Sequence, residues 1–332
     1  MPAMPRPKKQ HFVPELHLKH FVGTEPPGMV WTYDVKSGRV APSLPTETGS
    51  ETNFYSTLDE NGQHVDVIET WLSEVEDKAA NPYAKLLRGE IPSGQERADF
   101  ATYLASLYAR SPAMRRLNGQ VLASGMLAKV KAVTEDPEAF EEARRALEAE
   151  GKLESPISRE ELLAFISDPS KYTLDVDRTA TLPALLLSDR LQGPFFEMGW
   201  MVLGSNNQHI ITCDSPVCRA ADPRTIDPLC GDAGFANPTV QVTAPLSSNR
   251  CLYMGWRDDV PGVTPVPKEE ARMLNRQRAH YAERFLYADR LDSGIKRLGQ
   301  KHAEHGHRVS VSGMINDAEL PAIQVVRKLK PS

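Results

Sequence analysis

Two segments in the first half of the chain carry apolar residues at helical spacing. Between residues 65 and 80 the apolar positions are Ile68, Leu72, Val75 and Ala79. Between residues 96 and 110 they are Phe100, Tyr103, Leu104 and Leu107. Because an α-helix repeats every ~3.6 residues, each set lies on one face of a helix. We predict two amphipathic helices that pack against each other, the first ending ahead of Pro82.

Three further helices are predicted downstream. The segment 137–151 is charged and alanine-rich, which favours a solvent-facing helix. Ser158 followed by Glu161 fits a capping box, which predicts a helix through Ile166. The segment 267–289 returns to a helical pattern after an intervening region of different character.

That intervening region favours strands. Short apolar runs separated by Gly, Asn and Pro predict extended segments at 200–203, 209–212, 240–242 and 251–253. Helices followed by strands predict an α+β fold, a helix-rich single domain with a small mixed or antiparallel sheet in the C-terminal half. We expect this domain to cover residues 11–315, between a disordered N-terminal tail over 1–10 and a C-terminal tail over 316–332.

Composition and charge narrow the class of protein. The chain has 332 residues and a formal net charge of −5, which argues against a protein that coats nucleic acid through overall basicity. The basic run 272–278 is typical of a solvated helix face. The longest aliphatic stretch, Leu185 to Leu187, is far shorter than the ~20 apolar residues that span a bilayer. We therefore expect no membrane partner.

Cysteine usage indicates the redox environment. The four cysteines are Cys213, Cys218, Cys230 and Cys251. A chain of this length does not need a disulfide framework, and no CxxC pair indicates a zinc site. We expect reduced, buried thiols and a cytoplasmic location.

Charged residues on the first two predicted helices suggest an ion pair. Glu69 and Glu76 are seven residues apart and flank the apolar stripe of their helix. Arg110 lies three residues after Leu107 on the stripe of the next helix, where a semi-buried guanidinium needs a carboxylate partner. We expect Arg110 to pair with Glu69 or Glu76. The pair either fixes the register of the helices or forms part of a site that recognises an anion.

Two further residues are candidates for chemistry. His11 precedes Pro14 in an extended run and is either a general base or metal ligand, or a hydrogen-bonded structural residue. His17 and His20 have weaker claims. Asp214 ends a predicted strand before a turn, where a carboxylate either serves a ligand site or caps backbone N–H groups.

Short sequence blocks in a fixed order resemble a known family. The blocks are His11-Phe12-Val13-Pro14, Trp31 to Asp34, Asn53-Phe54-Tyr55, Glu69, Glu76, Arg110 with Pro112, Trp200, Thr212-Cys213-Asp214-Ser215-Pro216 and Pro245-Leu246-Ser247. From about residue 11 to about residue 290 the chain resembles the family called domain of unknown function 4238, with departures at His17, Cys213 and Ser215. The resemblance implies one folded unit and, for some members, an association with antiviral defence. The resemblance does not imply any particular biochemical activity.

Two hypotheses of different classes follow. In the first, the protein hydrolyses phosphoester bonds of nucleic acid or a nucleotide, assisted by Mg2+ or Mn2+. Glu69, Glu76 and Asp214 would be metal or acid/base groups, His11 a base and Arg110 a phosphate clamp. In the alternative, the protein is a non-catalytic module that binds a small anionic ligand or a partner protein. One open cleft shared by His11, Arg110 and Asp214 would favour the enzyme, and burial of each beside a local partner would favour the module.

Overall fold

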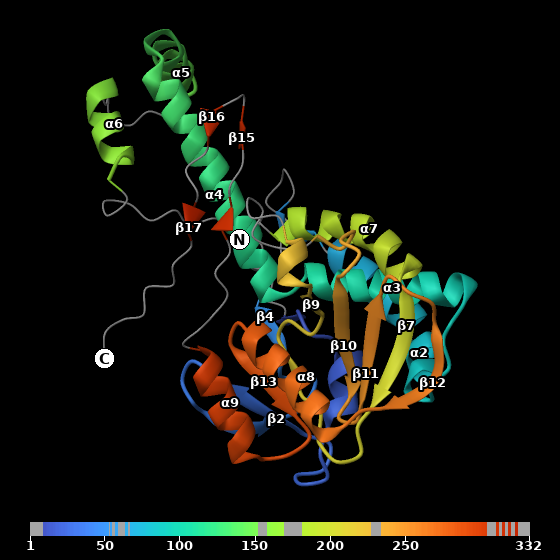
Figure 1. Ribbon diagram of the computed structural model, residues 1–332. Helices are drawn as coiled ribbons and strands as arrows, with labels where there is room; N and C mark the ends of the chain where they lie inside the picture. The colour runs from blue at the N-terminus through green and yellow to red at the C-terminus, as the bar shows by residue number, and fades with distance from the viewer. Residues whose placement is uncertain are drawn as a thin grey trace.

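The computed structural model describes residues 9–303 apart from 53, 55–56, 59–63, 66, 152–157, 169–180 and 227–233, together with strands at 310–311, 314–315, 318–319 and 323–324. Figure 1 shows two sheets with their covering helices and a group of helices that extends away from them. The larger sheet is formed by the C-terminal half of the chain, and the smaller one combines strands from both halves. The fold is α+β, as predicted.

The larger sheet has the strand order β12, β7, β11, β10, β9. These strands are β7 (Gly199–Gly204), β9 (Cys218–Ala220), β10 (Gln241–Ser247), β11 (Arg250–Gly255) and β12 (Val260–Pro265). All neighbours are antiparallel except β12 and β7, which run parallel. The sheet is therefore mixed.

Three helices cover one face of this sheet and form the main core. α2 (Val67–Leu87) packs against α3 (Gly94–Ala109), which packs against α7 (Thr181–Glu197). The buried residues that meet between them and the sheet include Leu86, Phe100, Leu104, Trp200, Val202, Val242, Leu252 and Met254. Because alternate strand residues point to the same face, the intervening residues of β7, β10 and β11 point to the opposite face.

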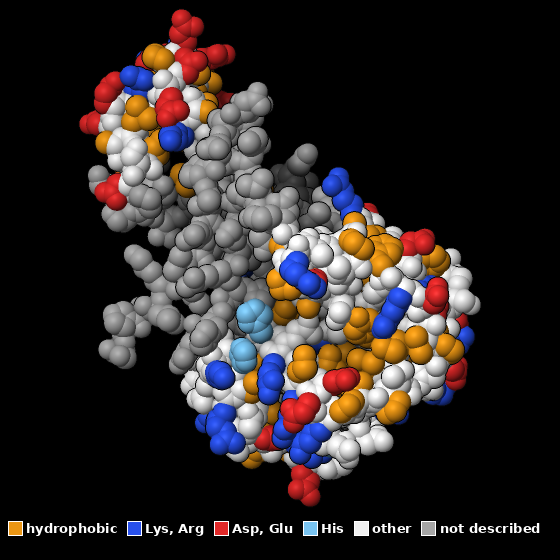
Figure 2. All heavy atoms as spheres, in the orientation of Figure 1, with side chains coloured by type: hydrophobic (Ala, Val, Ile, Leu, Met, Phe, Trp, Pro, Cys, Tyr) orange, Lys and Arg blue, Asp and Glu red, His pale blue; other side chains and the backbone are white. Residues whose placement is uncertain are grey.

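One helix, α8 (Lys268–Tyr281), packs on that opposite face. Cys251 of β11 belongs to a small apolar cluster with Leu274 of α8. The hydroxyl of Thr243 in β10 donates to Gln277 Oε1 of α8 at 2.7 Å. Figure 2 shows hydrophobic side chains (orange) gathered over the sheet beside α8, so the helix leaves part of this face uncovered.

The smaller sheet joins the two halves of the chain. Its strand order is β3, β2, β13, β8, and all neighbours are antiparallel. The strands are β2 (Val30–Asp34), β3 (Val40–Ser43), β8 (Thr212–Cys213) and β13 (Phe285–Ala288), and α9 (Ser293–Ala303) contacts β2. This sheet brings the Asp214 turn close to the N-terminal segments.

The remaining N-terminal elements are short. They are β1 (Lys9–His11), α1 (Glu15–Leu18), a 3-10 turn (Lys19–Phe21), β4 (Ser50–Thr52), β5 (Thr57–Leu58) and β6 (His64–Val65). β1 pairs with β4, and His11 lies opposite Ser50. Phe12 and Val13 both donate backbone hydrogen bonds to Gly49 O, which fixes β1 against the core.

Three consecutive helices form the group that extends from the sheets. They are α4 (Pro112–Glu135), α5 (Pro137–Ala149) and α6 (Arg159–Ile166), and both α5 and α6 contact α4. The predicted capping box of Ser158 and Glu161 is present. Within the described part of the chain, no helix is long and apolar enough to cross a membrane.

The prediction that the first helix ends ahead of Pro82 is wrong. α2 continues through Pro82 to Leu87, and Pro82 itself is buried. Tyr83 and Leu86 extend the apolar stripe into the core. Their burial outweighs the backbone hydrogen bond that a proline removes from a helix.

Two predicted segments near the smaller sheet also differ. The helix predicted over 267–289 ends at Tyr281, and residues 285–288 form β13, because Leu286 and Tyr287 are fully buried in the sheet. The strand predicted over 209–212 is a loop up to Ile211, whose N–H donates to the Asn275 side chain.

Both predicted tails contain paired strands. β1 begins at Lys9, inside the expected tail 1–10, because Lys9 and Gln10 pair with Thr52 and Glu51. Residues 1–8 lie outside the described part of the chain. In the expected tail 316–332, residues 318–319 pair with 314–315 and residues 323–324 pair with 310–311. Backbone pairing of such short strands needs no apolar pattern, so the sequence gives no sign of it.

Candidate functional site

Arg110 and Glu76 form the predicted ion pair between α2 and α3. Arg110 follows the last residue of α3 and is 1% exposed, and its Nη1 lies 2.7 Å from Glu76 Oε1. The Glu76 side chain is 26% exposed. Glu69, two turns earlier on α2, is half-buried. The expected pairing is therefore confirmed for Glu76, and it links the C-terminal end of α3 to the middle of α2.

Asp214 caps backbone groups of a distant segment. Its Oδ1 accepts the N–H of Glu283 at 2.8 Å, and its Oδ2 accepts those of Arg284 and Phe285 at 2.7 and 2.9 Å. Burial raises the pKa of Asp214 to about 6, while the three N–H donors act in the opposite direction. Both carboxylate oxygens are occupied, as the capping alternative expects.

Ion pairs from the first turns of α4 reach neighbours of His11 and of Asp214. Arg115 in the first turn of α4 binds Glu51, which adjoins the residue opposite His11. Arg116 binds Glu283, whose N–H donates to Asp214. His11 is half-buried on β1. Arg110 and Asp214 are buried, each beside its own partner.

His17, which had a weak claim, lies in a buried hydrogen-bond network. Its Nε2 is 2.8 Å from Thr212 Oγ1, and its Nδ1 is 3.3 Å from the Tyr83 hydroxyl. Tyr83 donates to Leu246 O at 2.7 Å. Because the Tyr83 proton is directed at Leu246, we assign the ring proton of His17 to Nδ1.

Electrostatics keep this imidazole neutral. Burial, with smaller contributions from His20, Arg110 and Arg278, lowers the pKa of His17 to about 3. His17 therefore lies near two buried arginines, one on α3 and one on α8. The sequence did not single out the second.

Arg278 is the residue that sequence reasoning missed. It is fully buried on α8, and its Nη2 donates to Thr243 Oγ1 at 2.6 Å and lies 3.8 Å from Cys251 Sγ. Within the described residues, Nε and Nη1 have no hydrogen-bond partner of good geometry, and no carboxylate forms an ion pair with the guanidinium, although the Cys218 thiol interacts with it. Arg110 thus has a carboxylate partner, whereas Arg278 has none within the described residues.

Thiols take the place of a carboxylate around Arg278. Burial lowers the pKa of Arg278, but the thiols of Cys218, Cys251 and Cys213 outweigh it and raise that pKa overall. Burial raises the pKa of Cys218, but Cys213 and Arg278 together hold it below its usual value. The thiols of Cys213 and Cys218 both donate to Ser215 O, at 3.1 and 3.6 Å. The surroundings of Arg278 are therefore polar and rich in sulfur.

Comparison with known proteins assigns the chain to a protein family. The family described as protein of unknown function (DUF4238) matches residues 9–292. The chain belongs to the DUF4238 family. The match runs from β1 to the residue before α9, so the resemblance seen in the sequence is confirmed. No curated protein and no solved structure matches the chain.

The carboxylates predicted to bind metal in this DUF4238 protein are otherwise engaged. Glu76 binds Arg110, and both oxygens of Asp214 accept backbone hydrogen bonds. Across the described ranges, no three His, Cys, Asp or Glu side chains are placed to hold a metal ion. The predicted ligand set of Glu69, Glu76 and Asp214 does not assemble.

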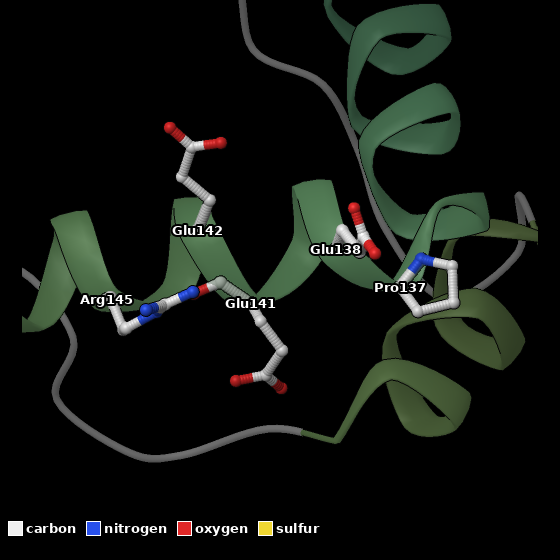
Figure 3. Close-up of a pocket in the computed structure, with 5 residues that line it drawn as sticks. All are labelled: Pro137, Glu138, Glu141, Glu142 and Arg145. Carbon is white, nitrogen blue, oxygen red and sulfur yellow. The ribbon is translucent and has the colours of Figure 1, made fainter.

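A depression on α5 of the DUF4238 protein is lined by one exposed helix alone. The residues along it are Pro137, Glu138, Glu141, Glu142 and Arg145. Figure 3 shows the side chains of Glu141 and Glu142 pointing to opposite sides of the helix. Glu141 also pairs with Arg144 at 2.8 Å. These carboxylates do not converge on a ligand, so the interior around Arg278 is the better candidate.

Proposed function

We propose that this DUF4238 protein binds a small anionic ligand, with a phosphoryl or carboxylate group, at the guanidinium of Arg278. The observation that carries the proposal is a fully buried arginine whose Nε and Nη1 have no hydrogen-bond partner within the described residues. Transfer of an uncompensated charge out of water is costly, so buried charges are normally paired. An anion at these donors would satisfy both nitrogens at once, because a guanidinium presents its N–H groups as a fork.

The neighbouring groups support an anion at this point. Ser215 carries a buried hydroxyl with no partner in the described part of the chain, and it lies beside the thiols that surround Arg278. His17, whose pKa Arg278 helps to lower, is neutral and adds no charge of its own. The guanidinium of Arg278 has no carboxylate partner in the described part of the chain, so the local charge favours an anionic guest.

Thermal unfolding with added inorganic phosphate tests the proposal. A ligand that binds only the folded state at 100 times its Kd adds about 2.7 kcal/mol of stability, so the Tm of the protein should rise with phosphate concentration. Arg278→Met should abolish the rise. Arg276→Met is the matched control, because Arg276 is exposed on the same helix. A rise that persists in Arg278→Met, or no rise with phosphate, sulfate or acetate, contradicts the proposal.

A second variant separates an external anion from an internal thiolate. If the Cys218 thiolate neutralises Arg278, Cys218→Ser should lower the free energy of unfolding without any anion present. If an external anion does so, Cys218→Ser should keep the phosphate-dependent rise in Tm. If Cys218→Ser is less stable without any anion, and phosphate does not stabilise the natural protein, the pair of Cys218 and Arg278 has a structural role only.

Hydrolysis of phosphoester bonds in nucleic acid or a nucleotide is the second candidate, and antiviral defence is its expected setting. A histidine outside the predicted site favours it. His209 Nδ1 lies 2.7 Å from Asp289 Oδ2, and the His209 side chain is 37% exposed while that of Asp289 is 12% exposed. A carboxylate that orients a solvent-accessible imidazole is the arrangement of a general base.

An activity screen tests this second candidate. Purified protein is assayed against nucleotides and nucleic acids with and without Mg2+ or Mn2+, and its metal content is measured. His209→Gln should then remove activity without lowering the Tm. Activity that survives in His209→Gln would exclude His209 as the base.

We also place the protein in the cytoplasm. Cys213, Cys218 and Cys251 are buried free thiols, which fits a reducing compartment. Fractionation of cells that express the full chain tests this location.

A further inference from the structure

A groove lies at the ends of three strands of the larger sheet, on the face that α8 only partly covers. It is lined by residues at the end of β9, the start of β10 and the end of β11, and its volume is about 450 Å³. Binding sites for small molecules commonly occupy ~300–1,000 Å³. The groove therefore has room for a ligand of the size of one nucleotide.

Trp256 forms one wall of the groove. It is 41% exposed, although its Nε1 donates to Phe235 O at 3.0 Å. The hydrogen bond fixes the indole while part of its surface stays accessible. A fixed and accessible aromatic ring is a platform on which a planar group can stack.

Arg257 adds a cation beside this platform. Its guanidinium carbon lies 4.2 Å from the centre of the Tyr253 ring, and its Nη2 lies 3.8 Å from Met201 Sδ. Within the described residues, no carboxylate forms an ion pair with Arg257. Stacking on an aromatic ring holds a guanidinium in place and leaves N–H groups for an anion.

The floor and rim of the groove complete the site. A Cβ on Gly255 would lie 3.5 Å from Tyr253 Cε1, so glycine keeps this part of the floor clear. Gln241, opposite Gly255 in the sheet, is exposed and offers an amide donor and acceptor. Asp222 is the carboxylate on the rim, and Arg224 neutralises it through a bidentate pair.

We propose that this groove binds a nucleotide, with the base stacked on Trp256 and the phosphate bound by Arg257. A base is planar and aromatic, and a phosphate suits a guanidinium that has no carboxylate partner. The amide of Gln241 can bond to polar atoms of the base or sugar. This site is separate from Arg278 and does not depend on the anion proposed there.

Calorimetric titration of the full chain with the four nucleoside 5′-monophosphates tests the proposal. At least one should bind, and Trp256→Ala and Arg257→Gln should each weaken it about tenfold or more, in line with base stacking of ~1–3 kcal/mol. The nucleoside that lacks the phosphate should bind the natural protein more weakly than the monophosphate does, by about the factor that Arg257→Gln causes for the monophosphate. Arg276→Gln is the control, because Arg276 is exposed on α8 and is not among the residues that line the groove.

Two more arms make the test decisive. Gly255→Val, which fills the floor in a strand that favours β-branched residues, should abolish binding while the melting temperature stays close to that of the natural protein. Arg278→Met should leave binding unchanged, so failure of one site is distinguishable from failure of the other. A short single-stranded oligonucleotide that binds at least tenfold more tightly than the monophosphate identifies a strand as the source of the nucleotide, and equal affinity identifies the free compound. No binding by any monophosphate, or undiminished binding in Trp256→Ala and Gly255→Val, overturns the proposal.

Discussion

Arg110 and Arg278 are both almost fully buried, yet their surroundings differ. Arg110 joins α2 to α3 through Glu76 at 2.7 Å. Arg278 sits between α8 and the larger sheet, where it donates to Thr243 and lies among thiols. The first charge is matched within the chain. The second has no carboxylate within the described residues.

The difference shows that burial alone does not reveal the role of an arginine. A buried arginine with a carboxylate is a structural link whose removal leaves the partner exposed to an apolar environment. A buried arginine without a carboxylate must be neutralised by other groups or by a ligand. An arginine is therefore a structural ion-pair partner in the region around Arg110 and a candidate ligand site in the region around Arg278.

Removal of the matched charge should have the largest effect. Arg110→Met should lower the free energy of unfolding by about 3 kcal/mol, because it leaves Glu76 partly buried without its cation. Glu76 is 26% exposed, so water reduces the loss toward the lower end of the usual range for such pairs. Urea unfolding measures the change. The double variant Arg110→Met with Glu76→Leu should recover most of it, and no recovery would show that Arg110 acts through other contacts.

A pH series tests whether burial and the nearby charges keep His17 neutral in the folded protein. In the unfolded chain His17 gains a proton near pH 6.5, while in the folded chain it stays neutral down to about pH 3. Stability through this group is therefore complete above pH 6.5 and is lost as the pH falls. The loss should reach about 3 kcal/mol at pH 4.

The comparison for that series is His17→Gln. Its unfolding free energy should fall less steeply between pH 7 and pH 4, although His20 contributes a similar dependence in both proteins. Equal slopes in the two proteins would show that folding does not lower the pKa of His17.

A smaller effect is expected at Asp214, whose carboxylate accepts hydrogen bonds from three backbone N–H groups. Asp214→Asn should lower the unfolding free energy by about 1 to 3 kcal/mol, because one amide oxygen cannot accept all three N–H donors of residues 283–285. Thermal melts measure the loss. If Asp214 is catalytic instead, Asp214→Asn would keep its Tm and lose activity.

The sequence predicts much of the region around Arg110. The apolar faces of α2 and α3 and a lone cation on the second stripe are enough to infer the packing and its ion pair. The fold class follows from helices that precede strands. Asp214 was found as a strand-end carboxylate, but its donors lie 69 to 71 residues away in sequence, so only the structure identifies them.

The region around Arg278 was missed because its helix looks solvated. Basic residues over 272–278 suggested an exposed face, yet the buried positions of α8 are Ala271, Asn275, Arg278 and Ala279. Their spacing of four, three and one marks a helix face, and this signal was readable. The groove at Trp256 has no comparable pattern, since it is built from the ends of three strands that meet only in the folded sheet.

The most direct test of the contrast between the two arginines is the unfolding free energy of Arg278→Met, measured without added anion beside Arg110→Met. Thr243 keeps a partner in Gln277 after this change, and a buried charge that has no carboxylate partner in the described part of the chain is replaced by an apolar side chain of similar length. We predict that the unfolding free energy of Arg278→Met is no more than about 1 kcal/mol below that of the natural protein, the cost of the hydrogen bond lost to Thr243. Arg110→Met should be clearly less stable. A loss of about 3 kcal/mol or more in Arg278→Met would contradict the account, because it would show that the chain itself supplies the counter-charge.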